Sequence, residues 1–577
     1  MDYMEKYRFW LVSDAFDEET KKELQAIDGD DKEIKERFYK DLEFGTGGLR
    51  GIIGAGTNRM NKYTVGKATQ GLANYILKNN PDGAKMGVAI AYDSRNMSPE
   101  FAERSALVLN ANGIKAYVFD ELRPTPELSY AVRALGCTAG IVVTASHNPP
   151  EYNGYKVYWA DGAQVVYPKD KGIIGEVNAI SDFSLIKTMD RKEAEEKGLF
   201  NVIGKEIDDG FIKAIKAQAV RPEEIKKAED MVIVYTPLHG TGNKPVRRVL
   251  GEVGFKNVYV VPEQEKPDKN FSTVGYPNPE DPKAFTLAIE LAKEKNAEII
   301  VGTDPDADRI GVVIRDEKGN YDILTGNMTG ALLTEYVLNG RKEKGLLPEN
   351  AAVIKTIVTT EMVRAIAESY NAELIEVLTG FKFIGEKIKQ FEEDHSHTFV
   401  FGFEESYGCL SGTYARDKDA VGAAMLVCEM AAYYKNRGMT LHDALEELYK
   451  KYGFYKEGVK SVTLKGIDGA EKIGKIMAYL RENTPEGFGG NKVLTVKDYK
   501  SGVFTDVATG NKSESPLPAS DVLYYNLEDR AWLCVRPSGT EPKIKFYMGV
   551  KAESSDAAVA KVEAMEKSVD ELLEKIN

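Results

Sequence analysis

The chain alternates short apolar runs with longer segments in which apolar residues recur at helical spacing. An apolar run at 87–95 precedes a segment of helical pattern at 98–113, and a second apolar run follows at 115–120. These segments predict a strand, a covering helix and a second strand, which together form a βαβ unit. Further apolar runs that open into polar loops begin at residues 139, 231, 297 and 397.

The polar loops after these runs are the first places to search for chemistry. Each is rich in glycine, hydroxyl or carboxylate groups. In open α/β sheets, ligands bind at the carboxyl ends of the strands. The pattern therefore predicts an α/β protein whose functional residues lie in loops at strand ends.

The length of 577 residues indicates three to four domains, at about 150 residues per domain. A charged stretch at 188–208, a turn at 317–320 and a Gly/Lys-rich passage at 452–460 are candidate joints. The last segment, 557–577, has the pattern of an amphipathic helix. We expect four domains, at 1–205, 206–322, 323–450 and 451–577.

The composition is that of a folded protein, with 43% hydrophobic and 29% charged residues. The chain has 76 Lys and Arg against 90 Asp and Glu, a net charge of −14, and no dense basic run. We therefore expect no nucleic-acid partner and no binding to anionic lipid.

Three features predict a cytoplasmic protein. The first residues lack the basic and apolar regions of a secretory signal. The most apolar stretch, 423–434, contains Glu429 and falls far short of the roughly 20 residues that cross a bilayer. The four cysteines show no CxxC spacing, which disfavours a disulfide scaffold or a zinc site.

The loop TASHNPPEYNGYK, at 144–156, places Ser146 next to His147. On extended backbone, consecutive side chains point to opposite faces, and the G-x-S-x-G elbow is missing, so a Ser-His hydrolase triad is disfavoured. Asn-Pro and Pro-Pro steps keep the segment out of a helix and predict a rigid loop that exposes Ser146. A structural serine is the alternative to a catalytic one.

The loop GTDPDADR, at 302–309, carries Asp304, Asp306 and Asp308 at alternate positions. Such spacing lets the backbone direct three carboxylates to one point, a ligand set that suits Mg²⁺. An EF-hand requires Gly at its sixth position and Glu at its twelfth, where this chain has Arg309 and Arg315. A metal site is favoured over a solvated acidic turn.

Two further loops carry donors for an anion. RPSGTEPKIKFY, at 536–547, offers the guanidinium of Arg536, two hydroxyl groups and a glycine that lets backbone N–H groups approach a phosphate. An ordinary turn between two strands is the alternative. The glycine-rich segment 44–51 places Arg50 in a similar way, but neither a G-x-G-x-x-G nor a P-loop pattern supports nucleotide binding.

A fourth loop, GFEESYG at 402–408, has Glu404 and Ser406 two positions apart. On extended backbone both side chains face one side, and Glu405 faces the other. A carboxylate and a hydroxyl together suit the vicinal hydroxyl groups of a sugar, although solvent-facing glutamates give the same pattern.

Together these loops resemble the landmarks of the α-D-phosphohexomutases, in the order of that family: TASHNP, DPDADR, FEES and RPSGTEP. The segments FGTGGLRG, TGFKFIG (379–385) and ARDKDAV (415–421) are also similar to pieces of the family. The resemblance spans nearly the whole chain and is strongest to the phosphoglucomutase branch. It implies a heart-shaped protein of three related α/β domains and a C-terminal α+β domain around a central cleft.

The resemblance also implies an activity and a role for each loop. The expected reaction interconverts α-D-glucose 1-phosphate and glucose 6-phosphate through a phosphoserine, with Mg²⁺ as the metal and glucose 1,6-bisphosphate as intermediate and activator. Ser146 would carry the phosphoryl group and bind the metal with Asp304, Asp306 and Asp308. The other catalytic residues implied are His147, Lys156, Arg309 and Lys418, and those implied for substrate binding are Arg50, Thr379, Gly380, Lys382, Glu404, Ser406, Arg536, Ser538, Gly539 and Thr540.

The sequence also allows alternatives to the phosphoglucomutase activity. Phe403 stands before Glu404, as in the branch with phosphopentomutase and glucose-1,6-bisphosphate synthase, whereas many phosphoglucomutases have Gly there. A mutase for phosphomannose or phosphopentose is therefore an alternative. A haloacid-dehalogenase-type phosphatase would use Asp304 as nucleophile, but it requires Thr or Val where Asp308 stands. An inactive sugar-phosphate-binding protein is the last alternative.

Overall fold

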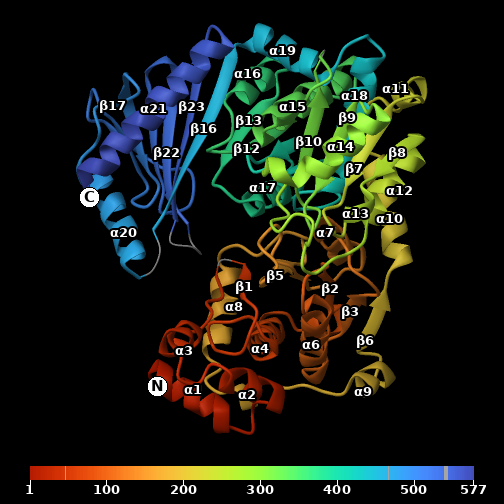
Figure 1. Ribbon diagram of the computed structural model, residues 1–577, viewed down its shortest axis with the longest axis vertical. Helices are drawn as coiled ribbons and strands as arrows, with labels where there is room; N and C mark the ends of the chain where they lie inside the picture. Colours follow the sequence, from red (N-terminus) through yellow and green to blue (C-terminus); the bar gives the residue numbers. More distant parts are fainter. Residues whose placement is uncertain (46, 317, 465–466, 539–542, 577) are drawn as a thin grey trace. The chain divides into compact units, whose positions relative to one another are not determined.

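The first sheet of the protein contains six strands in the order β1-β5-β4-β2-β3-β6 (Figure 1). The computed structural model describes residues 1–45, 47–316, 318–464, 467–538 and 543–576. Strands β4, β2, β3 and β6 run parallel, whereas β5 is antiparallel to both β4 and β1. The strands are β1 (Gly48–Ile52), β2 (Val88–Tyr92), β3 (Ala116–Phe119), β4 (Ala139–Val143), β5 (Tyr152–Trp159) and β6 (Phe200–Ile203).

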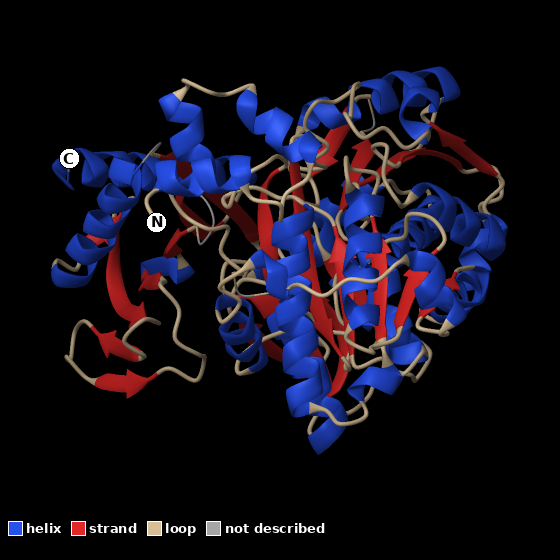
Figure 2. Ribbon diagram, turned by 90° about the horizontal axis from the view of Figure 1, so that it is seen from below, coloured by secondary structure: helices blue, strands red, loops and turns tan. Residues whose placement is uncertain are grey.

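Both faces of this sheet are covered, which explains why its central strands are apolar at every position. In β2, Val88 and Ile90 join a core with helices α4, α6 and α8, whereas Ala89 and Ala91 join a second core with α7. Figure 2 shows strands of the protein, drawn in red, with helices on both sides of them. The βαβ unit predicted at 87–120 is confirmed as β2, α6 and β3.

A second sheet of five strands has the order β11-β10-β9-β7-β8. Strands β9, β7 and β8 are parallel, and β10 returns antiparallel beside β9. Its core lies against α14 and includes Val234, Ile300 and Phe285. The strands are β7 (Val232–Thr236), β8 (Asn257–Val260), β9 (Ile299–Thr303), β10 (Ile310–Arg315) and β11 (Tyr321–Leu324).

These sheets belong to a compact unit, unit 1, made of Met1–Gly326 and Phe381–Leu441. It also contains the antiparallel pair β14 (Thr398–Phe403) and β15 (Cys409–Ser411). Its helices are α1 (Tyr3–Val12), α2 (Glu18–Gln25), α3 (Asp31–Phe38), α4 (Lys62–Asn79), α5 (Gly83–Met86), α6 (Ser98–Ala111), α7 (Thr125–Ala134), α8 (Lys169–Asn178), α9 (Arg191–Glu196), α10 (Lys205–Lys216), α11 (Pro222–Lys227), α12 (Asn243–Val253), α13 (Pro262–Glu265), α14 (Thr286–Lys295), α17 (Phe381–Asp394) and α18 (Ala420–Lys435).

The second unit, unit 2, consists of Asn327–Gly380 and His442–Asn577. Its first part has a parallel pair, β12 (Ala351–Thr356) and β13 (Glu373–Val377), with helices α15 (Gly326–Glu343) and α16 (Met362–Ser369). Its second part is built on a largely antiparallel sheet in the order β16-β23-β22-β21-β18-β19-β20, with β17 paired to β18.

The core of that antiparallel sheet lies against two helices, α20 and α21, through residues such as Met477 and Val562. The predicted C-terminal amphipathic helix is confirmed as α21. The remaining elements of unit 2 are α19 (Leu441–Tyr452), β16 (Phe454–Thr463), α20 (Ile467–Glu482), β17 (Gly487–Phe488), β18 (Asn491–Asp498), β19 (Val503–Asp506), β20 (Lys512–Glu514), β21 (Leu523–Leu527), β22 (Trp532–Pro537), β23 (Lys543–Ala552) and α21 (Ser555–Ile576).

The apolar segments and the cysteines agree with the sequence analysis. Among the helices of the described residues, none has both the length and the apolar character to cross a bilayer. The four cysteines, Cys137, Cys409, Cys428 and Cys534, are all described, and each is buried and forms no disulfide. Burial raises the pKa of the Cys137 thiol to about 12.

Candidate active site

Three carboxylates converge in the loop after β9. One oxygen from each of Asp304, Asp306 and Asp308 lies within 4.8 Å of the others, and all three residues are buried. The predicted convergence is therefore confirmed. The chain turns through the left-handed region at Ala307, with φ of 51°, before it enters β10. Asp304 stabilises this turn, because its Oδ1 accepts from the backbone N–H groups of Asp308 and Arg309 at 3.1 and 3.0 Å.

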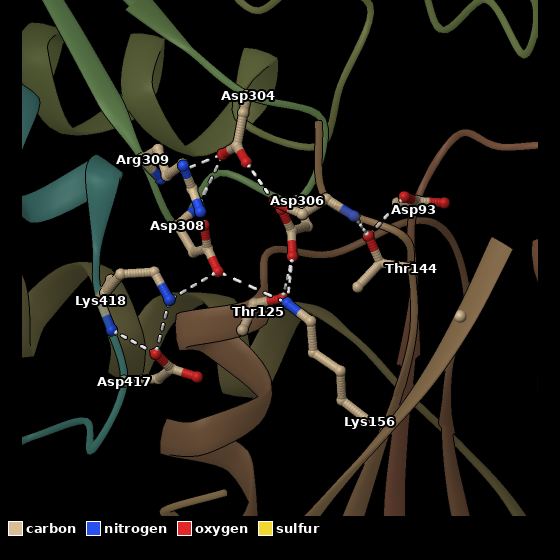
Figure 3. Close-up of polar contacts among 12 residues, drawn as sticks. Asp93, Thr125, Thr144, Lys156, Asp304, Asp306, Asp308, Arg309, Asp417 and Lys418 are labelled. Atoms are coloured by element: carbon tan, nitrogen blue, oxygen red, sulfur yellow. Dashed lines mark hydrogen bonds and ion pairs between the residues drawn. The ribbon is translucent and has the colours of Figure 1, made fainter. Parts of the chain in front are cut away.

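Two lysines balance part of this negative charge (Figure 3). Lys156, on β5, lies 2.9 Å from Asp306 Oδ2 and 3.5 Å from Asp308 Oδ2. Lys418 lies 3.0 Å from Asp308 Oδ2 and 3.2 Å from Asp417 Oδ1. Although burial opposes it, the two lysines hold the pKa of Asp308 below its usual value. Burial and repulsion from the other two carboxylates raise the pKa of Asp304 well above its usual value.

Ser146 lies directly at this cluster. Its Oγ donates to Asp304 Oδ2 at 2.7 Å, across 158 positions of sequence. The serine is only 4% exposed, so the expectation of an exposed serine is wrong. The loop folds inward because Ser146 has a φ of 53° and its N–H donates to Thr144 Oγ1 at 2.8 Å.

The same backbone conformation corrects the expectation for His147. Because Ser146 is in the left-handed region rather than extended, the two neighbouring side chains meet, and His147 Nδ1 lies 3.2 Å from Ser146 Oγ. Burial and the charges of Arg309 and Arg50 lower the pKa of His147 well below its usual value. The imidazole is therefore neutral at pH 7, and one of its two ring nitrogens can accept a hydrogen bond.

The carboxylate cluster has the properties of a cation site. Asp306 Oδ1 and Asp308 Oδ1 are buried and have no hydrogen-bond partner among the described residues. Buried carboxylate oxygens without a partner carry a large desolvation cost, which a bound cation removes. A set of three carboxylate oxygens is typical of sites for hard divalent cations.

Arg309 borders the cluster. Its Nε lies 3.9 Å from Asp308 Oδ1, and its Nη1 donates to Glu280 Oε1 at 2.7 Å. Arg50 is an exposed residue of β1 whose charge acts on both His147 and the nearby Arg95. Both predicted arginines thus lie in the electrostatic surroundings of Ser146.

Glu404 and Ser406 follow β14 in a turn that Glu404 N closes by donating to Gly408 O at 2.8 Å. The strand ends at Phe403, so the expected extended geometry of this segment is wrong. Glu404 is 5% exposed and Ser406 is half-buried. The positive charges of Lys418 and Arg309 act on the Glu404 carboxyl, which associates this turn with the cluster.

Glu404 gives a prediction for stability against pH. Burial raises its pKa to about 7, well above the usual value near 4.5. Between these values the folded chain binds more protons than the unfolded chain, so this group contributes stability that is lost as pH rises. The loss approaches about 3 kcal/mol between pH 5 and 8. We expect Glu404→Gln to remove that part of the dependence, measured as the free energy of urea unfolding across this range.

The substitution Glu386→Gln, at an exposed position of α17, is the matched control, and it should keep the pH dependence of the original chain. An identical pH dependence in Glu404→Gln and the original chain would contradict the raised pKa.

The other predicted residues are distributed as follows. Lys382 lies in the first turn of α17, in unit 1, with its ammonium 5.1 Å from the Phe383 ring centroid. Thr379 and Gly380, half-buried after β13, belong to unit 2. Arg536 and Ser538 also belong to unit 2, at the end of β22, where Ser538 N donates to Lys543 O at 2.7 Å. Gly539 and Thr540 lie outside the described residues.

Several residues of the site were missed in the sequence. Thr125, at the start of α7, donates from its hydroxyl to Asp306 Oδ2 at 2.8 Å. Asp93 and Arg95 follow β2 and contact the serine loop, and Asp417 pairs with Lys418. The signal for Asp93 and Arg95 was present, because both charges directly follow an apolar strand.

Comparisons with known proteins agree with this geometry. The chain matches three family profiles, described as "Phosphoglucomutase/phosphomannomutase, alpha/beta/alpha" domain I, domain II and domain III. The matched residues are 41–183, 209–319 and 325–452.

Curated relatives give the same result. A phosphoglucomutase of Staphylococcus aureus (strain MRSA252) is 40% identical over 537 residues, which cover 93% of this chain and 94% of that protein. One from Staphylococcus epidermidis is 37% identical and covers 96% of each chain. Among solved structures, a putative phosphomannomutase of Thermus thermophilus superposes with a TM-score of 0.67 at 21% identity, covering 93% of this chain and 99% of that one.

Proposed function

The chain belongs to the phosphoglucomutase/phosphomannomutase family, and on this basis we propose that it interconverts α-D-glucose 1-phosphate and glucose 6-phosphate. Such an enzyme is an isomerase that acts by intramolecular phosphoryl transfer. One observation carries the proposal: the Ser146 hydroxyl lies 2.7 Å from Asp304, inside a cluster of three buried carboxylates. Glucose as the sugar is supported by the relatives at 40% and 37% identity, both phosphoglucomutases.

In the proposed reaction, Ser146 carries a phosphoryl group and donates it to the free hydroxyl of the hexose phosphate. The P–Oγ bond of Ser146 breaks as the bond to the sugar oxygen forms, and the proton of that sugar hydroxyl ends on Ser146 Oγ. The product of this first step is glucose 1,6-bisphosphate, which also serves as the activator. The bisphosphate then turns around and returns its other phosphoryl group to Ser146. The buried position of the serine supports this role, because a phosphoserine must be kept from water.

Mg²⁺ is the metal we propose for the site, held by Asp304, Asp306, Asp308 and an oxygen on Ser146. The partnerless oxygens of Asp306 and Asp308 support this assignment. When bound, the ion supplies positive charge opposite the equatorial oxygens of the transferring group. In the same way, Lys156, Lys418 and Arg309 provide positive charge around the cluster.

The return of a phosphoryl group to Ser146 requires that its hydroxyl lose a proton. Two acceptors are within reach, Asp304 Oδ2 at 2.7 Å and His147 Nδ1 at 3.2 Å. We propose that His147 accepts this proton, because its Nδ1 has a free lone pair and the negative charge of a phosphoryl group nearby would oppose the lowering of its pKa, whereas Asp304 would be a ligand of the metal.

We propose that the remaining residues bind the sugar phosphate. Glu404 and Ser406 would accept and donate hydrogen bonds at the sugar hydroxyls, with Lys382, Thr379 and Gly380 also contacting the substrate. The non-reacting phosphate would be held by Arg536, Ser538, Gly539 and Thr540, and Arg50 would also bind the substrate. We also propose a cytoplasmic location, in agreement with four cysteines that form no disulfide.

The activity is tested by separating each sugar 1-phosphate from its product by anion-exchange chromatography. For glucose, product formation is also coupled to NADPH production with glucose-6-phosphate dehydrogenase. The purified protein, with Mg²⁺ and a trace of glucose 1,6-bisphosphate, should convert glucose 1-phosphate faster than the 1-phosphates of mannose or ribose. Preference for one of these would assign the alternative mutase activity. Release of inorganic phosphate without isomerisation would reject the proposal.

Arg536→Ala tests the phosphate-binding role of unit 2. Loss of a charge-assisted hydrogen bond costs about 1.5 to 3 kcal/mol, so the KM for glucose 1-phosphate should rise about 10-fold to 100-fold, with a smaller change in kcat. The exposed Arg530 is the matched control. Arg530→Ala should leave both constants unchanged, and equal kinetics for the two variants would remove Arg536 from the site.

A further inference from the structure

Arg95 is a fully buried arginine that the proposed chemistry does not use. Its side chain has 0% exposure, and it follows β2 next to the serine loop. Its guanidinium binds four backbone carbonyl oxygens of that loop. Nη2 donates to Ser146 O and Asn148 O at 2.5 Å each, and Nη1 donates to Pro149 O at 2.8 Å and Tyr152 O at 3.2 Å.

Asp93 connects this guanidinium, through Thr144, to the backbone N–H of Ser146. Its Oδ2 lies 3.3 Å from Arg95 Nε and also accepts from the Thr144 hydroxyl at 2.7 Å. Thr144 Oγ1 in turn accepts from the N–H of Ser146 at 2.8 Å. The two backbone groups of Ser146 are thus held by one buried ion pair, the carbonyl directly and the N–H through Thr144.

This clamp acts on a backbone that is unfavourable by itself. Ser146 has a φ of 53°, a conformation that costs a residue with a side chain about 1 to 3 kcal/mol. In this conformation the side chain turns back toward Asp304 and His147. The conformation therefore depends on surrounding contacts, and Arg95 contributes more hydrogen bonds to the loop than one lysine could, since a lysine has only three donors.

A second contact fixes the guanidinium itself. Arg95 lies over the ring of Phe271, 4.9 Å from its centroid, and Phe271 is fully buried. Within unit 1, the position of the serine loop is therefore linked through Arg95 to the domain that carries the three aspartates.

We propose that Arg95 is a positioning residue for phosphoryl transfer, and that its clamp on residues 146–152 holds the Ser146 hydroxyl against the carboxylate cluster. This proposal rests on the proposed function of Ser146. Arg95 itself touches no reacting atom, so its removal should reduce kcat and leave substrate affinity nearly unchanged.

The test compares three variants at Arg95, each normalised to folded protein. We expect Arg95→Ala to lower kcat about 100-fold, the loss typical of a displacement near 1 Å, with KM within about threefold. Added guanidinium ion should restore activity of Arg95→Ala, by about tenfold, because it fits the space left by the side chain. Arg95→Lys keeps the charge but loses the planar set of guanidinium donors. Its activity should be low and should not increase when guanidinium ion is added.

The third variant, Asp93→Asn with Arg95→Met, removes both charges, so that neither remains buried and unpaired. If Arg95→Ala does not fold, this variant still allows the proposal to be tested. Amide hydrogen exchange over residues 144–153 should be at least about tenfold faster in this variant than in the original chain. That measurement does not depend on activity, so it separates a failure of this proposal from a failure of the proposed function.

Arg59 is the matched control, since it is 6% exposed and also donates to backbone carbonyls, those of Glu36 and Asn58. Arg59→Ala should affect stability without lowering kcat per folded molecule. The proposal is overturned if the Arg95 variants keep full kcat per folded molecule, if exchange at 144–153 is unchanged, or if all three variants fail to fold.

Discussion

Ser146→Ala is expected to lose mutase activity by at least about 10⁴-fold, the largest effect of any single change in this chain. The substitution removes the oxygen atom that carries the phosphoryl group in the proposed reaction. The fold should persist, because the loop is held through backbone groups of residue 146 and not through its hydroxyl. The measurement is the coupled assay, with intact-protein mass to detect phosphate on the enzyme.

A second serine provides the comparison for this variant. Ser105 is also fully buried in unit 1, but its hydroxyl donates within α6, to Phe101 O at 2.8 Å. Ser105→Ala should remain active and should retain the mass increase of a phosphoryl group. Full turnover by Ser146→Ala would reject the phosphoserine mechanism.

The second large effect is expected at the metal site. Asp306→Asn removes one charged ligand and leaves an amide whose oxygen binds a hard cation less strongly. Activity at saturating glucose 1-phosphate should fall about 100-fold or more, and the Mg²⁺ concentration for half-maximal activity should rise. Calorimetric titration with Mg²⁺ measures the same loss without the reaction.

The original chain should also lose activity in excess chelator and regain it with added Mg²⁺. Asp322, an exposed carboxylate on β11, supplies the control. Asp322→Asn should bind Mg²⁺ as the original chain does. Equal activity of the original chain with and without chelator would disprove the metal assignment.

The parts of the site that depend on the residue types and spacing within one loop could be predicted from the sequence. Asp304, Asp306 and Asp308 converge as their spacing predicted, and the strand before them is buried. Four polar loops at the ends of apolar strands led to the right family, which the profiles over 41–452 confirm in three parts. The domain boundaries remain predictions.

The errors came from backbone conformation that short-range pattern does not encode. The prediction that Ser146 and His147 point to opposite faces assumed an extended chain, but φ of Ser146 is positive because contacts from distant residues hold it so. Those contacts come from Asp93 and Arg95, which lie about 50 positions earlier in the sequence. The hydrogen bond from Thr125 to Asp306 joins residues 181 positions apart, and it too could be seen only in the folded chain.

The buried cysteines make the chain convenient for measuring the motion of its parts. None of the four thiols is accessible to a maleimide dye in the folded state. A cysteine placed at Lys192 in unit 1 and another at Lys512 in unit 2, both exposed positions, would therefore be the only labelled sites. Single-molecule energy transfer between the two dyes would then report the distance between the two labelled positions with and without sugar phosphate, without first rebuilding the protein as a cysteine-free background.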